Sequence, residues 1–151
     1  MRLDTPEKTT YRLSGKEKMN NTPGVILAFD FGLKRIGTAI GNELSRTARP
    51  LEIINAEAND IRFAKIGELI EEWQPVKLIV GLPSYPDGTE HEMTRRCKRF
   101  ANQLRGRFSL EIIMVDERYS SSVLHFQRGK ADDAHAAALI LQQYFDESIS
   151  D

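Results

Sequence analysis

An aspartate inside an apolar run is the feature that most constrains how this chain can fold. Strand-forming residues occupy Val25–Phe31, residues 32–34 form a tight connection, and β-branched residues return at 36–40. The pattern predicts two antiparallel strands in the core of a domain, with Asp30 inside the first. Because a buried and unpaired carboxylate costs several kcal/mol, hydrogen bonds, a cation or a metal ion must compensate it.

Strand and helix patterns follow this hairpin. A third short strand is expected at residues 51–54. Apolar residues then recur at helical spacing from Phe63 to Trp73, behind a cap at Asn59 or Asp60. The first three strands are therefore expected to form an antiparallel meander, and the chain then changes to a helical period.

A capping box at Thr89 and Glu92 indicates the start of a second helix. The apolar face expected for that helix comprises Met93, Cys97, Phe100, Ala101 and Leu104. The other expected elements are strands at 77–81 and 110–115 and helices at 120–127 and about 132–145. This order predicts an α/β fold, a mixed five-stranded sheet in which the antiparallel meander is joined by two parallel strands, with helices on both faces.

Length and composition favour one globular domain. The chain has 151 residues, of which 40% are hydrophobic, enough for one core. Residues 1–22 are expected to form a disordered polar leader, 23–146 the domain and 147–151 a tail. A single cysteine excludes an internal disulfide and a zinc-finger site, and the net charge of −1 excludes a uniformly basic nucleic-acid binder. Without a signal peptide or membrane span in the sequence, a cytoplasmic location is expected.

Acidic residues mark the ends of two strands and the start of the last helix. Asp30 lies near the end of the first strand, Glu117 follows the fifth, and Asp132 and Asp133 open the final helix. Strand ends and helix starts converge at the sites of such folds, so we expect these carboxylates to meet. At 100° per residue, Asp133 lies on the same side of its helix as Ala137 and is the better candidate of the two aspartates. A bound divalent cation usually offsets the repulsion between carboxylates that lie this close together.

Four motifs in order resemble one known family. They are "DFGLKRIG" from Asp30, "GLP" with "DGT" from Gly81, "VDERYSS" from Val115, and "DDAHAAALILQQYF" from Asp132. Together they resemble the YqgF or RuvX proteins, considered nucleases for pre-16S rRNA, with an RNase H-like fold related to Holliday junction resolvases.

The resemblance implies both the catalytic residues and the reaction. Asp30, Glu117 and Asp133 would be the catalytic acids and the ligands of Mg²⁺ or Mn²⁺, hard cations that bind carboxylate oxygen. The reaction would be phosphodiester hydrolysis at the 5′ end of pre-16S rRNA, as a step of ribosome biogenesis.

Basic residues near these motifs are candidates for substrate binding. Lys34 and Arg35 in the first turn would bind phosphates, and Arg118 would pair with an acid or with the substrate. A basic run on the second helix includes Arg95, Arg96 and Arg99, which would follow a nucleic-acid backbone or simply form a solvated helix face. Gly32 and Gly37 are expected to leave room for a substrate phosphate.

Other functions stay open at this point. The substrate is expected to be structured RNA, pre-16S rRNA or a pre-ribosome, with a DNA junction as the alternative for a resolvase-like nuclease. A non-catalytic RNA-binding protein of ribosome assembly would use the same fold. An ATPase of the actin and sugar-kinase kind shares the Asp-x-Gly turn but needs two such domains. The protein is expected to be a monomer or a homodimer and not to associate with a membrane.

Overall fold

A computed structural model describes residues 24–83, 92–117 and 133–149. The elements are β2 (Val25–Phe31), β3 (Arg35–Asn42), β4 (Thr47–Asn55), α1 (Asn59–Trp73), β5 (Lys77–Leu82), α2 (Glu92–Phe108), β6 (Glu111–Asp116) and α4 (Asp133–Ile149). The expected leader at 1–22, the Thr89 cap and the short helix at 120–127 lie outside the described residues.

The five strands form one mixed sheet in the order β4-β3-β2-β5-β6. β2 pairs with β3, and β3 with β4, in antiparallel register. β5 lies parallel to β2 on its other side, and β6 lies parallel to β5. The predicted meander with two added parallel strands is therefore confirmed, and β2, which carries Asp30, is the central strand.

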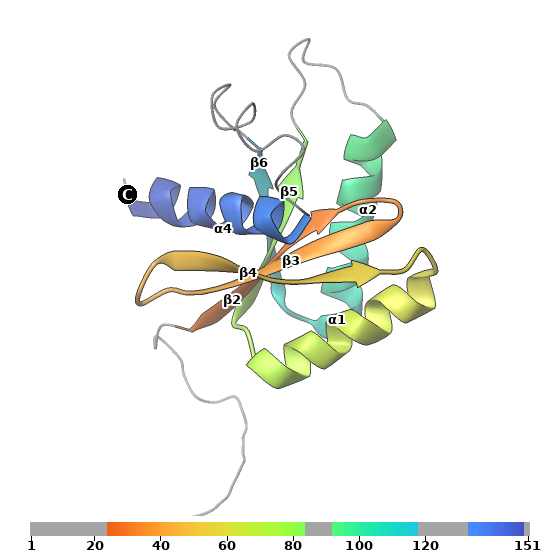
Figure 1. Ribbon diagram of the computed structural model, residues 1–151, viewed down its shortest axis with the longest axis horizontal. Coiled ribbons are helices and arrows are strands. Elements are labelled where there is room, and N and C mark those ends of the chain that lie inside the picture. The colour runs from red at the N-terminus through yellow and green to blue at the C-terminus, as the bar shows by residue number, and fades with distance from the viewer. Residues whose placement is uncertain (1–23, 84–91, 118–132, 150–151) are drawn as a thin grey trace, which may run out of the picture.

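Helices cover both faces of the sheet, as predicted: α4 crosses one face, whereas α1 and α2 pack on the other (Figure 1). Side chains alternate along β2, so Leu27 and Phe29 enter the core under α1 and α2, and Ile26 and Ala28 enter the core under α4. Asp30 follows Ile26 and Ala28 in this alternation, so its side chain points to the face of the sheet that α4 covers.

Three local expectations differ from the structure. β4 begins at Thr47 rather than at residue 51, and it includes Pro50, which a strand at the edge of a sheet tolerates. The N-cap of α1 is Ala58, without a side-chain hydrogen bond, and Asp60 instead accepts the backbone N–H of Ile61. At the other end of the chain α4 continues to Ile149, into the stretch 147–151 that was expected to be a tail.

Candidate active site

Asp30 lies between two glycines of the neighbouring strands. It pairs with Gly37 of β3 in the antiparallel register. The parallel register aligns Phe29 with Val80, which brings Gly81 of β5 beside Asp30 on the other side. The aspartate therefore occupies the middle of the sheet at the end where β2 and β5 terminate.

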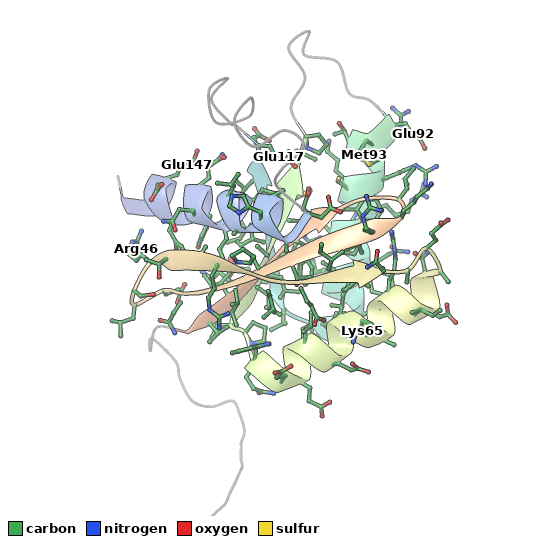
Figure 2. The ribbon with its side chains drawn as sticks, in the orientation of Figure 1. Arg46, Lys65, Glu92, Met93, Glu117 and Glu147 are labelled. Carbon is green, nitrogen blue, oxygen red and sulfur yellow. The ribbon has the colours of Figure 1, made fainter. Side chains whose placement is uncertain are left out.

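Glu117 reaches this end of the sheet from β6. Its backbone N–H donates to the Leu82 carbonyl oxygen at 3.0 Å, which extends the β5–β6 pairing by one residue. A Cβ atom placed on Gly81 would lie 3.0 Å from the Glu117 Oε2 atom, so the carboxylate rests directly over that glycine. Figure 2 shows Glu117 in the upper part of the molecule, at a height similar to Glu92 at the start of α2, with Arg46 at the left side.

Asp133 is the first residue of α4, and its backbone packs on β3. A Cβ atom on Gly37 would overlap the Asp133 carbonyl group. A Cβ atom on Gly32 would collide with the Arg35 carbonyl oxygen, because that glycine closes the β2–β3 turn. The prediction that Gly32 and Gly37 leave room for a substrate phosphate is therefore wrong, since the space beside both is filled by the protein's own backbone.

The electrostatics of Asp30 report the approach of the other two acids. Burial, and after it the charges of Glu117 and Asp133, together raise the pKa of Asp30 to about 7. Burial also raises the pKa of Glu117. Three carboxyl groups from β2, the end of β6 and the start of α4 thus share one electrostatic environment.

The chemistry of these donors fits a hard divalent cation, because all three offer carboxylate oxygen and their mutual repulsion would be relieved by positive charge. The three carboxyl groups are not arranged as a complete set of metal ligands. Among residues 24–83, 92–117 and 133–149, no group of three or more His, Cys, Asp or Glu side chains is arranged to hold a metal ion. One cation is already present, since Arg35 Nε donates to Asp133 Oδ2 at 3.0 Å.

The basic candidates divide into several groups. Lys34 is exposed in the β2–β3 turn, next to Arg35. Arg95 and Arg96 both pair with Glu92 one turn earlier in α2, at 3.1 and 3.0 Å. Arg99 is exposed on the same helix. Arg118 lies outside the described residues.

Arg62 is a residue of this region that the sequence analysis missed. Only 3% of it is exposed, and its guanidinium donates to the carbonyl oxygens of Ala56, Gly32 and Leu33, each at 2.6 Å. It therefore ties the turn that follows Asp30 to the start of α1. Arg62 precedes Ile66 by four residues and Leu69 by seven, which places it on the apolar face of α1. This spacing was the signal in the sequence that the arginine is buried.

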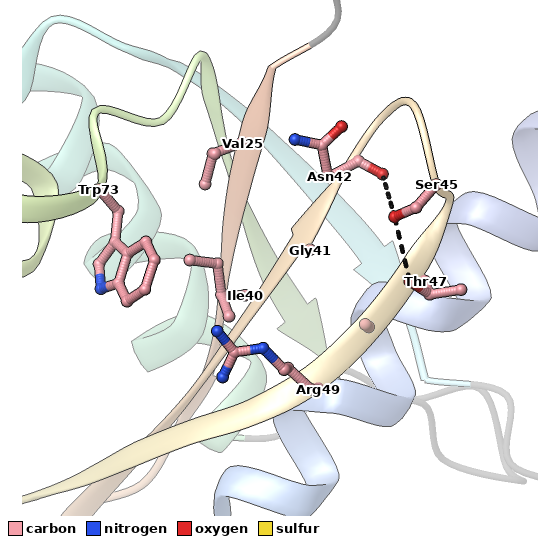
Figure 3. A pocket seen from close by; sticks show the side chains of 9 residues that line it. Val25, Ile40, Gly41, Asn42, Ser45, Thr47, Arg49 and Trp73 are labelled. Atoms are coloured by element: carbon pink, nitrogen blue, oxygen red, sulfur yellow. Dashed lines mark hydrogen bonds between the residues drawn. The ribbon is translucent and has the colours of Figure 1, made fainter.

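A cavity of about 260 Å³ lies far from these acids (Figure 3). Val25 at the start of β2 and Asn42 at the end of β3 line it, so it sits at the opposite end of both strands from Asp30. The Arg49 guanidinium lies 5.9 Å from the centre of the Trp73 ring at this cavity. None of the expected site residues line it.

No helix in the described part of the chain has the length and apolar character needed to cross a membrane.

Comparison with known proteins identifies the family. A family model described as RuvX, Holliday junction resolvase, matches residues 24–147. A relative from Paraburkholderia xenovorans is 54% identical over 127 residues, covering 80% of this chain and 87% of the relative. One from Bordetella petrii is 56% identical over 123 residues, covering 80% and 94%. Both carry the name "Putative pre-16S rRNA nuclease".

Solved structures support the fold. Thermus thermophilus RuvC in complex with a Holliday junction substrate matches with a TM-score of 0.56 at 13% identity, covering 84% of this chain and 96% of that one. Fowlpox virus resolvase in complex with Holliday junction DNA matches with a TM-score of 0.52 at 13% identity, covering 83% and 99%. The family match over most of the chain and the architecture agree: this protein belongs to the RuvX family of Holliday junction resolvases and has their RNase H-like fold.

Proposed function

We propose that this protein is a divalent-metal-dependent endonuclease that processes the 5′ end of pre-16S rRNA by phosphodiester hydrolysis. The observation that carries the proposal is the position of Asp30, a carboxyl group on the central strand whose pKa is raised by burial and by the charges of Glu117 and Asp133. The name shared by the relatives supplies the RNA substrate. We place this activity in the cytoplasm.

In this proposal Asp30, Glu117 and Asp133 hold Mg²⁺ or Mn²⁺. Such an ion, when bound, supplies Lewis acidity for the attacking water and offsets charge on the leaving oxygen. Asp30 would be the most rigidly held of these ligands, because a central strand places it between Gly37 and Gly81. Glu117 and Asp133 approach from the end of β6 and the start of α4.

Protonation of Asp30 limits the site at low pH. A carboxyl group with a pKa of about 7 is largely neutral at pH 6, and a neutral carboxyl is a poor ligand for a hard cation. The affinity of the metal-free protein for Mg²⁺ or Mn²⁺ is therefore expected to rise between pH 6 and 8 as Asp30 loses its proton.

The basic residues serve substrate binding in this proposal. Lys34 and Arg35 in the β2–β3 turn and Arg118 after Glu117 contact phosphates next to the scissile bond. Arg95, Arg96 and Arg99 on α2 contact phosphates further along the strand. Because each phosphate contact releases counterions, RNA binding should weaken with salt, and each lost contact should reduce the slope by about one unit.

Cleavage of three labelled substrates tests the proposal: pre-16S rRNA, duplex DNA and a four-way DNA junction, each with Mg²⁺ or Mn²⁺. We expect the RNA to be cut near the mature 5′ end, and Asp30→Asn to lower the rate by several orders of magnitude. Preferred cutting of the junction would favour a resolvase-like DNA nuclease, the activity of the family description. RNA binding without cleavage of any substrate would instead indicate an assembly protein.

A further inference from the structure

A second cavity opens on the face of the sheet opposite to the acids. It has a volume of about 360 Å³ and lies where Phe31 of β2 meets α1 and α2. Phe31 follows Asp30 directly, so the cavity and the acids share one end of β2 but lie on its two faces. The side chains that matter here are Phe31, Arg62, Arg96, Arg99, Phe100 and Gln103.

The floor of this cavity is aromatic and rigid. The ring centroids of Phe31 and Phe100 are 4.9 Å apart, and those of Phe63 and Phe100 are 5.9 Å apart. The Arg62 guanidinium lies 5.3 Å from the centre of the Phe31 ring and is fixed by its three backbone acceptors. The Phe31 ring is therefore contacted by both Phe100 and the Arg62 guanidinium, and a planar group that enters the cavity meets this preformed Arg62–Phe31 pair.

The walls of the cavity are polar and come from two helices. Arg96, Arg99 and Gln103 lie at spacings of three and four residues, so they share one face of α2. Arg96 pairs with Glu92, whereas Arg99 makes no ion pair with any residue that the structure describes. Asn59 at the start of α1 and Glu57 in the loop before this helix also line the cavity.

This combination of groups matches one nucleotide. Guanidinium groups bind phosphate in a bidentate manner, and the amides of Asn59 and Gln103 can donate to and accept from a base edge. Proteins that recognise RNA take up unpaired bases on aromatic rings and arginine planes in this way. The volume is near the lower end for ligand pockets, which suits a single nucleotide and excludes a duplex.

We propose that this cavity binds one unpaired nucleotide of the RNA substrate, with the base against the Arg62–Phe31 pair and the phosphate at Arg99 and Arg96. The inference rests on the proposed function, because that function supplies RNA as the source of the nucleotide. A strand held here passes around the β2–β3 turn, past Lys34 and Arg35, to reach the acids on the other face. The cavity thus selects substrates with a single-stranded nucleotide beside the cleavage point.

Two pairs of variants on α2 test the inference. Gln103→Ala removes an amide from the cavity without a change of charge, and its matched control is Asn102→Ala, since Asn102 is the exposed neighbour outside the cavity. Arg99→Gln removes one positive charge from the cavity, and Arg105→Gln removes one from the same helix outside it. Dissociation constants are measured with EDTA for a labelled single-stranded RNA of about 12 nucleotides and for free nucleoside monophosphates.

We expect Gln103→Ala to weaken RNA binding about three- to tenfold and Arg99→Gln about tenfold or more, with both controls within about twofold of the parent protein. Equal effects within each pair would overturn the inference, because the cavity would then add nothing to general electrostatic attraction. Tight binding of a free nucleotide without binding of the RNA would also overturn it, because the nucleotide source would be a small molecule.

The outcome is separable from that of the proposed function. Binding is measured without divalent metal, so it does not require catalysis. If the parent protein cleaves pre-16S rRNA but the cavity variants bind like their controls, only the cavity inference fails. If the cavity variants lose binding but no RNA is cleaved with either metal, the nuclease proposal fails and the nucleotide site stands.

Discussion

The Arg35 Nε atom donates to the Asp133 Oδ2 atom at 3.0 Å, which joins the β2–β3 turn to the first residue of α4 across 98 positions of the sequence. Both side chains are about half exposed or less, 53% for Arg35 and 37% for Asp133. The pair gives Asp133 a positive partner in a region with two other acids. In the nuclease that we propose, Arg35 therefore competes with the metal ion for the carboxylate of Asp133.

Replacement of Arg35 is expected to increase metal affinity. Arg35→Gln should lower the dissociation constant for Mn²⁺ about two- to fivefold, because a half-exposed ion pair contributes about 0.2–1 kcal/mol and no longer competes. The same variant should bind RNA more weakly, since one phosphate contact is lost. Isothermal titration with Mn²⁺ and a salt series of RNA binding measure the two effects.

Lys34→Gln is the matched control for this variant, because it removes the same charge from the same turn. It should weaken RNA binding but leave the affinity for Mn²⁺ within about 1.5-fold, since Lys34 forms no ion pair with any residue in the described part of the chain and an exposed charge is largely screened. Similar gains in metal affinity for both variants would assign the effect to general electrostatics and not to the Asp133 pair.

The pKa of Asp30 predicts a pH-dependent gain in stability for Asp30→Asn. In the metal-free protein the carboxyl pKa rises from its ordinary 3.8 to about 7. The folded state then holds the proton more tightly than the unfolded chain, so this contribution is complete below pH 3.8 and is lost as pH rises to 7. The upper limit of the loss is about 4 kcal/mol, from 1.36 kcal/mol for each pKa unit.

An asparagine keeps the shape and cannot ionise. Asp30→Asn should therefore match the parent protein near pH 4 and exceed its free energy of unfolding by about 2 kcal/mol at pH 8, in urea titrations with EDTA. Asp116→Asn is the control, because Asp116 is an exposed acid at the end of β6. A variant of Asp30 that loses stability at pH 8 would show that the carboxylate is kept for a local hydrogen bond.

The sequence alone predicted the parts of this fold that depend on local pattern. The alternation of side chains in β2 and β3 depends on residues that are neighbours in the chain, and so does the helical spacing in α1 and α2. The strands, the helices and the position of Asp30 could therefore be predicted from the sequence. The Arg35–Asp133 pair, the Arg62 anchor and the contact of α4 with Gly37 depend on residues distant in the chain. Their geometry follows from the packing of α4 and α1 on the sheet, which periodicity does not encode.

Arg62 is expected to be among the most sensitive residues of the domain. Arg62→Met keeps much of the apolar volume but leaves the carbonyl oxygens of Ala56, Gly32 and Leu33 without their donor. These carbonyl groups are only partly buried, so water can replace part of the lost donor, and the free energy of unfolding should fall by about 1–3 kcal/mol in total. Urea unfolding followed by circular dichroism measures this change.

Lys65→Met gives the comparison on the same helix, because Lys65 is exposed and forms a local ion pair with Glu68 at 3.6 Å. It should change stability by less than about 0.5 kcal/mol. If Arg62→Met were equally mild, the hydrogen bonds of Arg62 would be replaced by water, and the turn after Asp30 would not depend on this residue.

Two glycine substitutions with opposite expected signs test how α4 is positioned. In Gly37→Ala the added methyl group would overlap the backbone carbonyl of Asp133, and backbone cannot turn aside as a side chain does. α4 must shift, so stability should fall by about 2 kcal/mol or more, as for other cases of overpacking. Because Asp133 moves with its helix, the gain in melting temperature from added Mn²⁺ should also shrink.

Gly106→Ala supplies the control within α2. A Cβ atom at Gly106 meets nothing within 4 Å, and alanine is the better helix former by about 1 kcal/mol. This variant should melt at a higher temperature than the parent protein and respond normally to Mn²⁺. If Gly37→Ala were destabilised but kept the full response to Mn²⁺, the metal ligands would not include Asp133, and the role of α4 would be to cover the sheet.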